Sequence, residues 1–82
     1  MSMYFFTYRG ATEARKGAAA LRNSGVPARI DRSPVQLSRS GCGYGLWIVP
    51  QKAELAAEIL RWEAPYERSY RMDRGGFREA PL

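Results

Sequence analysis

Two amphipathic helical segments alternate with four strand-like runs along this 82-residue chain. The order of these elements limits the possible folds more strongly than any other feature of the sequence. The first helix is predicted to begin at Thr12, a good N-cap, and to stop at the Asn-Ser-Gly sequence of residues 23–25. The second is predicted over residues 51–62, with Leu55, Ile59 and Trp62 on its apolar stripe and Ala56 and Leu60 beside it. Both segments are rich in alanine, which suits close packing on a sheet.

Four runs rich in aromatic and β-branched residues are predicted to be strands. They cover residues 3–8, 26–31, 44–49 and 66–72. The order β-α-β-β-α-β predicts an α+β, ferredoxin-like sandwich, with a four-stranded antiparallel sheet and two helices on one face. Residues 1–72 are expected to form this single domain, and residues 73–82 a flexible C-terminal tail.

The sheet face without helices is predicted to carry an exposed aromatic patch. Its candidate side chains are Tyr4, Phe6, Tyr8, Trp47 and Tyr70. Exposed apolar patches mark partner or ligand sites, and pairing with a second copy is the default expectation for such a patch. A homodimer through the sheet is therefore one expectation.

One cysteine and no histidine restrict the chemistry that the chain can perform. They exclude an internal disulfide and, in effect, a self-contained zinc site, and they remove Ser-His-Asp and Cys-His catalysis. We therefore expect no metal site, no cofactor and no stand-alone enzyme. The apolar runs are too short for a bilayer span and the first residues lack a signal-peptide pattern, so we expect a cytoplasmic protein without a membrane partner.

Arginine dominates the positive charge, with eleven Arg and two Lys in a chain of net charge +5. Such a bias favours bidentate contacts with phosphate or carboxylate groups. Four of the arginines follow residue 67, where a charged tail explains them equally well: Arg68, Arg71, Arg74 and Arg78. The composition leaves a polyanion site and a solvated tail both open.

Cys42 lies between Gly41 and Gly43 in a polar connection of residues 33–43. Flanking glycines would let a thiol approach a partner closely, and Arg39 is near enough in sequence to favour the thiolate. The alternative is that Cys42 is a small apolar residue, buried and inert. The sequence leaves both interpretations open.

The Gly43-Tyr44-Gly45-Leu46 stretch suggests a nucleic-acid alternative. An RNA-recognition motif carries a basic-Gly-aromatic-Gly-aromatic pattern on its third strand, where the aromatics stack on bases. In this chain Cys42 stands at the basic position and Leu46 at the second aromatic one. A nucleic-acid-binding module that uses an aromatic sheet face and arginines therefore stays an alternative, as does a dimerising regulatory domain without thiol chemistry.

The chain also resembles a known family over more than three-quarters of its length. The resemblance rests on YFFTYRGATEA at the start, on SGVPARI after the first helix, on a connection containing Ser-Pro, and on SRSGCGYGLWI. These features resemble the selenium/sulfur (Se/S) carrier protein-like family of small bacterial domains, whose function is itself mostly inferred.

The resemblance implies that Cys42 accepts sulfur or selenium, holding sulfur as a persulfide, and passes it to a partner. Ser40, Gly41 and Gly43 would shape the loop, and Arg39 would favour the thiolate. The implied partners are a protein sulfur donor such as a cysteine desulfurase and an unidentified acceptor. Transfer of this kind needs one accessible nucleophile rather than a catalytic triad.

Overall fold

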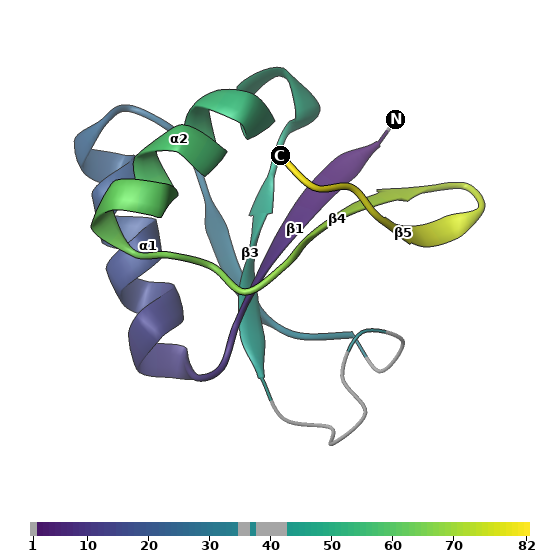
Figure 1. The fold of residues 1–82 in the computed structure, drawn as a ribbon, viewed down its shortest axis with the longest axis horizontal. Coiled ribbons are helices and arrows are strands. Elements are labelled where there is room, and N and C mark those ends of the chain that lie inside the picture. The colour runs from purple at the N-terminus through teal and green to yellow at the C-terminus, as the bar shows by residue number, and fades with distance from the viewer. Residues whose placement is uncertain (1, 35–36, 38–42) are drawn as a thin grey trace.

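A computed structural model of the chain describes residues 2–34, 37 and 43–82 (Figure 1). The elements are, in chain order, β1 (Met3–Tyr8), α1 (Ala11–Asn23), β2 (Arg29–Arg32), β3 (Tyr44–Ile48), the short 3-10 helix η1 (Pro50–Lys52), α2 (Ala53–Glu63), β4 (Ser69–Asp73) and β5 (Gly76–Glu79). The five strands form one antiparallel sheet in the order β2-β3-β1-β4-β5. Both helices lie on one side of this sheet (Figure 1). The expected α+β class is therefore confirmed.

The prediction of four strands was wrong, because the segment expected to be a tail contains β5. Gly75 and Gly76 allow the tight turn after β4, and Gly76 has a φ of +101°, which favours glycine. Phe77 then pairs with Met72 across the hairpin. Beyond β5, the Ser69 hydroxyl donates to the Ala80 carbonyl oxygen at 2.8 Å, so the chain after the hairpin is also bonded to β4.

The alternation of β1 is opposite to the predicted one. Tyr4, Phe6 and Tyr8 belong to the core between the sheet and the helices, so they do not form the open-face patch. Phe5 lies on the other face, where its register partners are Trp47 and Tyr70. Opposed residues of antiparallel strands share a face, so Trp47 and Tyr70 lie on the open face as predicted.

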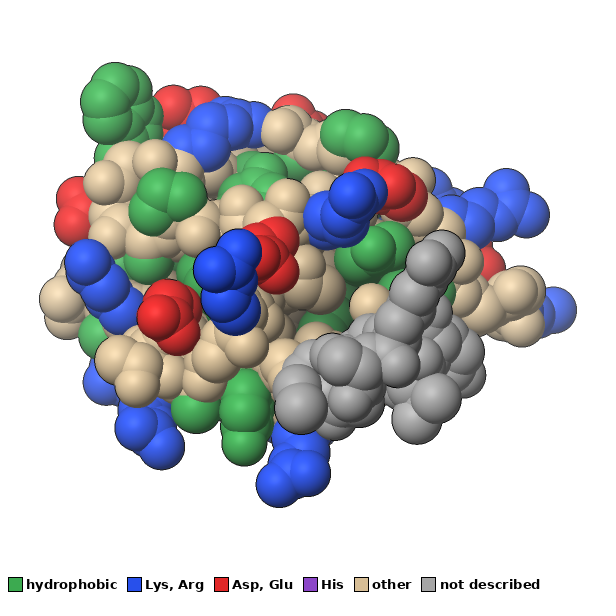
Figure 2. All heavy atoms as spheres, turned by 60° about the horizontal axis from the view of Figure 1, so that its bottom comes forward, with side chains coloured by type: hydrophobic (Ala, Val, Ile, Leu, Met, Phe, Trp, Pro, Cys, Tyr) green, Lys and Arg blue, Asp and Glu red, His purple; other side chains and the backbone are tan. Residues whose placement is uncertain are grey.

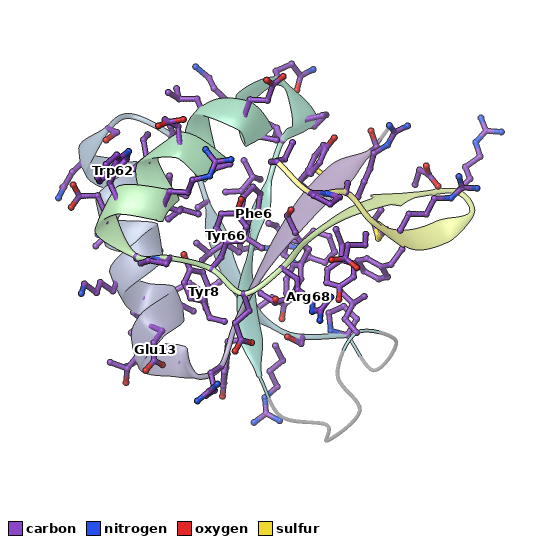
Figure 3. The ribbon with its side chains drawn as sticks, viewed as in Figure 1. Phe6, Tyr8, Glu13, Trp62, Tyr66 and Arg68 are labelled. Atoms are coloured by element: carbon purple, nitrogen blue, oxygen red, sulfur yellow. The ribbon has the colours of Figure 1, made fainter. Side chains whose placement is uncertain are left out.

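The core fills the space between the sheet and the two helices. It contains Phe6, Tyr8, Ala14, Ala18, Leu21, Val26, Leu46, Ile48, Ala56, Ala57, Leu60 and Ala64. The many alanines keep the helices close to the sheet, since a side chain of one carbon holds neighbouring backbones at short distance. Tyr66, from the segment before β4, packs edge-on against Phe6 with ring centroids 4.7 Å apart (Figure 3).

Tyr8 joins the two helices to the centre of the sheet. Its hydroxyl donates to the Ala64 carbonyl oxygen, just after α2, at 2.5 Å. It also lies against Gly17 of α1, where an added Cβ would come within 2.7 Å of the same hydroxyl oxygen. Burial, with a smaller contribution from Tyr66, raises the pKa of Tyr8 above its ordinary value.

The buried face of α2 is displaced from the predicted stripe toward Ala56 and Leu60, which were expected beside it. The side chains that face inward are Ala53, Ala56, Ala57 and Leu60. Leu55 is 48% exposed and Trp62 is 80% exposed, while Ile59 is partly buried. Two apolar stripes run along this helix, and the one with smaller side chains packs against the rest of the protein because it allows the closer approach.

The remaining differences concern element ends. Gly10, rather than Thr12, is the N-cap of α1, and no side chain caps that end. β2 begins at Arg29, three residues later than expected, and Val26 is instead buried in the core. Among the described residues, no helix is long and apolar enough to cross a membrane.

Candidate functional site

The predicted thiol site falls largely on residues that the structure does not describe. Cys42, Arg39, Ser40 and Gly41 lie outside the described residues. Gly43, the last member of the predicted set, is described and directly precedes β3. The described part of the candidate site therefore consists of Gly43 and the end of the sheet around it.

Gly43 is held at the base of the connection between β2 and β3. The Ser33 amide donates to the Gly43 carbonyl oxygen at 3.0 Å, which extends the pairing of Arg32 with Tyr44 by one step. Gly43 has a φ of +128°, a conformation that other residues rarely adopt. An added Cβ would also lie 3.3 Å from the Ser33 hydroxyl and 3.5 Å from the Tyr8 carbonyl oxygen. The position thus requires glycine for its backbone conformation and has little room for a side chain.

The same end of the sheet contains the beginning of α1. Tyr8 pairs with Tyr44, and the chain then passes through Arg9 and Gly10 into the helix. The Arg9 side chain is exposed and forms an ion pair with Glu67 at 3.5 Å. Arg32, also exposed, is the last residue of β2. Two arginines therefore lie at the end of the sheet where the connection that contains Cys42 links β2 to β3.

The arginine excess is partly balanced by acidic neighbours. Among the described residues, three arginines besides Arg9 lie within ion-pair distance of a carboxylate: Arg61 and Glu58 at 3.1 Å, Arg68 and Glu79 at 3.1 Å, and Arg71 and Asp73 at 3.8 Å. Cationic and anionic side chains stand beside one another over much of the face shown in Figure 2. Two of the four arginines after residue 67, Arg68 and Arg71, are thus paired with carboxylates of the β4–β5 hairpin, which weakens the case for a polyanion site there.

The open sheet face carries aromatic residues that the sequence pattern alone does not bring together. Phe5 lies over Gly45 and contacts Trp47, with ring centroids 4.7 Å apart. Trp47 in turn lies 6.0 Å from Phe77 of β5. The Trp47 indole N–H donates to Asp31 of β2 at 3.1 Å. This open-face cluster (Phe5, Trp47, Phe77) links β1, β3 and β5, and the bond to Asp31 adds β2. It would have been found from the sequence only with the fifth strand in place.

The side chains expected to stack on bases lie elsewhere. Tyr4 and Tyr44 pack against the core on the helix side of the sheet, as does Leu46. In an RNA-recognition motif the corresponding positions of the third strand face the open side. The Gly-aromatic-Gly pattern of this chain is therefore out of phase with a base-stacking face.

Within the part of the chain that the structure describes, no group of three or more His, Cys, Asp or Glu side chains is placed to hold a metal ion. The chain matches no family model, no curated protein and no solved structure in comparisons with known proteins. The function therefore has to be argued from the residues and their geometry.

Proposed function

We propose that this chain is a ferredoxin-like domain that carries sulfur, or selenium, on Cys42 and passes it to a partner protein. The order β2-β3-β1-β4 with both helices on one face supports the ferredoxin-like assignment, and β5 extends the sheet beside β4. The carrier role rests on the single thiol between two glycines and on the family resemblance of the surrounding sequence.

One structural observation carries most of the proposal: Gly43, the neighbour of Cys42, is bonded to Ser33 at the end of the sheet. Gly43 follows Cys42 directly in the sequence, so the described chain is anchored to the sheet one residue after the thiol-bearing position. A carrier needs its thiol near a rigid edge of the domain, so that docking of the domain presents the sulfur to the partner's reactive atom.

The transfer is balanced without an external oxidant. The Cys42 thiol loses its proton, and the thiolate attacks the outer sulfur of a persulfide held by the donor, such as a cysteine desulfurase. The sulfur–sulfur bond of the donor breaks, and the donor leaves as a thiolate that takes up a proton. A nucleophile of the acceptor then attacks the outer sulfur on Cys42, which leaves as a thiolate in turn.

Arginine side chains would assist by favouring the thiolate over the thiol. Arg39 is the candidate from sequence proximity, and Arg9 and Arg32 lie at the described edge of the sheet. In this proposal the chain has no catalytic turnover of its own, because the donor supplies the activated sulfur.

Mass spectrometry tests the proposal directly. The protein is incubated with a cysteine desulfurase, its cofactor and cysteine, and the intact mass is measured without reductant. We expect a gain of one sulfur atom that dithiothreitol removes and that the Cys42→Ser variant lacks. An unchanged mass, together with a thiol that resists alkylation in the folded protein, would contradict the proposal.

Gly43→Ala is the informative second variant, since it keeps the thiol but places a Cβ where the backbone has a positive φ. The carrier proposal predicts slower loading of Cys42 at an unchanged final level. A role of Gly43 that is purely structural would lower the stability of this variant without altering the loading rate of its folded fraction.

The nucleic-acid alternative is less well supported by the described residues. Tyr4 and Tyr44 contribute to the core, so their replacement by alanine should destabilise the protein rather than weaken binding selectively. Salt-dependent binding of single-stranded RNA that is lost with Trp47→Ala, in a folded protein, would favour this alternative over the carrier.

A further inference from the structure

An apolar ridge runs along one side of α2, with exposed side chains at its two ends and the partly buried Ile59 between them. It consists of Leu55, Ile59 and Trp62, which are spaced so that they follow one another along one side of the helix. Trp62 is the most exposed large apolar side chain among the described residues, at 80%. An exposed tryptophan that belongs to a continuous apolar ridge is typical of a contact surface rather than of a solvated helix face.

Beside this ridge lies a groove between α1 and α2. Its volume is about 520 Å³, and its lining residues are Ala20, Asn23, Ser24, Glu58, Ile59, Trp62 and Glu63. The side that belongs to α1 and the residue after it has only small or short side chains. The surface therefore has both a protruding apolar side chain and, next to it, a hollow lined by apolar and polar side chains of both helices.

Trp62 is also held in a defined orientation. Its indole N–H donates to one carboxylate oxygen of Glu58 at 3.3 Å, and Arg61 donates to the other oxygen at 3.1 Å. A side chain that is already oriented loses less conformational entropy on binding than a free one. The arrangement thus favours Trp62 as the central residue of an interface.

The two helices carry opposite charge on their outer sides. The exposed charged residues of α1 are mainly basic: Arg15, Lys16 and Arg22, against Glu13. Those of α2 are mainly acidic: Glu54, Glu58 and Glu63, against Arg61. A surface with adjacent basic and acidic stripes is complementary to a second copy of itself when the two are related by a two-fold axis.

We propose that the helix layer of this protein binds a second copy of the same chain. In the dimer, Trp62 of each copy enters the groove between α1 and α2 of the other, and the basic α1 lies opposite the acidic α2. This inference is independent of the carrier role. Trp62 lies on the outer side of α2, far from the start of β3 to which Cys42 is joined (Figure 3).

Sedimentation velocity over a range of protein concentrations tests the central contact. The unmodified protein is expected to dimerise, and the Trp62→Ser variant to raise the dimer dissociation constant roughly 30-fold, as for other central interface residues. Val49→Ser is the matched control, because Val49 is another exposed apolar residue, at 39%, and lies outside the groove. It should leave the dissociation constant unchanged.

Charge reversal distinguishes a second copy from any other partner. Lys16→Glu removes the net positive charge of the α1 stripe, and Glu63→Lys removes the net negative charge of the α2 stripe, so each variant alone should dimerise more weakly. A mixture of the two should form a heterodimer, because one of its two α1–α2 contacts then pairs an intact basic α1 with an intact acidic α2, which neither variant can do alone. Arg74→Glu, on the β4–β5 turn, changes the net charge as Lys16→Glu does and should not weaken the dimer.

A protein that stays monomeric up to its solubility limit overturns the proposal, as does a dimer that Trp62→Ser leaves intact. Two charge variants that remain monomeric when mixed overturn it as well. Binding of a basic amphipathic peptide through Trp62 by a protein that does not self-associate would also overturn it and would assign this surface to a foreign partner.

Discussion

The two faces of the sheet each bury one phenylalanine completely, but they do so with different partners. Phe6 and Phe5 are adjacent in β1 and both are 0% exposed. Phe6 is enclosed by the helix layer and by Tyr66. Phe5 has no helix above it; its ring lies over Gly45 and beside Trp47. Full burial of a side chain therefore does not by itself show which face carries the main core.

A second pair of residues extends the comparison to hydrogen bonds. On the helix side, the buried Tyr8 hydroxyl donates to the Ala64 carbonyl oxygen. On the open side, the Trp47 indole N–H donates to Asp31 in an exposed bond. The helix side thus depends on contacts between rigid elements, whereas the open side depends on side chains that can move when a neighbour is removed. Substitutions on the two faces test this difference.

Phe6→Ala is expected to have the largest effect. It should lower the free energy of unfolding by about 4 kcal/mol, because the packed helices cannot close the cavity that remains. Urea denaturation followed by far-UV circular dichroism measures this change. A loss below that of Phe5→Ala would show that the helix layer relaxes more easily than the open face, and would reverse the comparison.

Phe5→Ala removes the same atoms from the other face and should cost about 3 kcal/mol, near the lower end for such substitutions. Trp47 and Phe77 are partly exposed and can move into the vacated space above Gly45. The same denaturation experiment gives the value. Equal losses for the two phenylalanine variants would mean that the open-face cluster is as rigid as the core.

Tyr8→Phe should lower the free energy of unfolding by about 2 kcal/mol, because the Ala64 carbonyl oxygen loses its donor in a buried position. Gly17→Ala is a useful companion, since its Cβ would press on the same hydroxyl. In the Tyr8→Phe background that pressure is relieved, so the double variant should lose less stability than the sum of the two single losses. Strict additivity would indicate that Gly17 and Tyr8 do not interact.

Tyr8 also predicts a dependence of stability on alkaline pH. Its pKa is raised in the folded protein, so the unfolded chain releases this proton first as the pH rises. The contribution of Tyr8 is therefore complete below the ordinary tyrosine pKa of about 10 and decreases above it, by at most about 1.4 kcal/mol per pH unit. Tyr8→Phe should flatten this decline. An identical alkaline profile for both proteins would contradict the assignment.

The sequence was sufficient for the order of the first four strands and the two α-helices, but not for the faces they bury. In β1, aromatic residues occupy both alternations, so the pattern cannot decide whether Phe5 or Phe6 faces the helices. In α2, an apolar stripe of Leu55, Ile59 and Trp62 competes with one of alanines and Leu60. Size decides between them, because the alanines allow closer packing, and hydrophobicity alone favours the wrong stripe.

The fifth strand and the open-face cluster were missed for one shared reason. The Gly75-Gly76 pair is typical of a loose tail, but in this chain it connects two runs with apolar residues on the same side. Without β5, Phe77 has no place beside Trp47. Of the predicted thiol site, only the need for glycine at residue 43 is explained by the described geometry, through its positive φ and its bond to Ser33.

Trp47→Phe should have the smallest effect, a loss of about 0.5 kcal/mol, at the low end for a net hydrogen bond. The variant keeps an aromatic ring beside Phe5. It removes the exposed bond to Asp31, whose carboxylate water can solvate instead, together with the part of the partly exposed indole that a phenyl ring does not replace. Asp31→Asn is the matched control, because it retains an acceptor for the indole N–H and should cost still less. Denaturation of the three proteins at equal ionic strength measures the differences. A loss for Trp47→Phe as large as that for Tyr8→Phe would mean that the hydrogen bond from Trp47 to Asp31 is effectively buried. The hydrogen bonds of aromatic side chains would then contribute equally to stability on the two faces of the sheet.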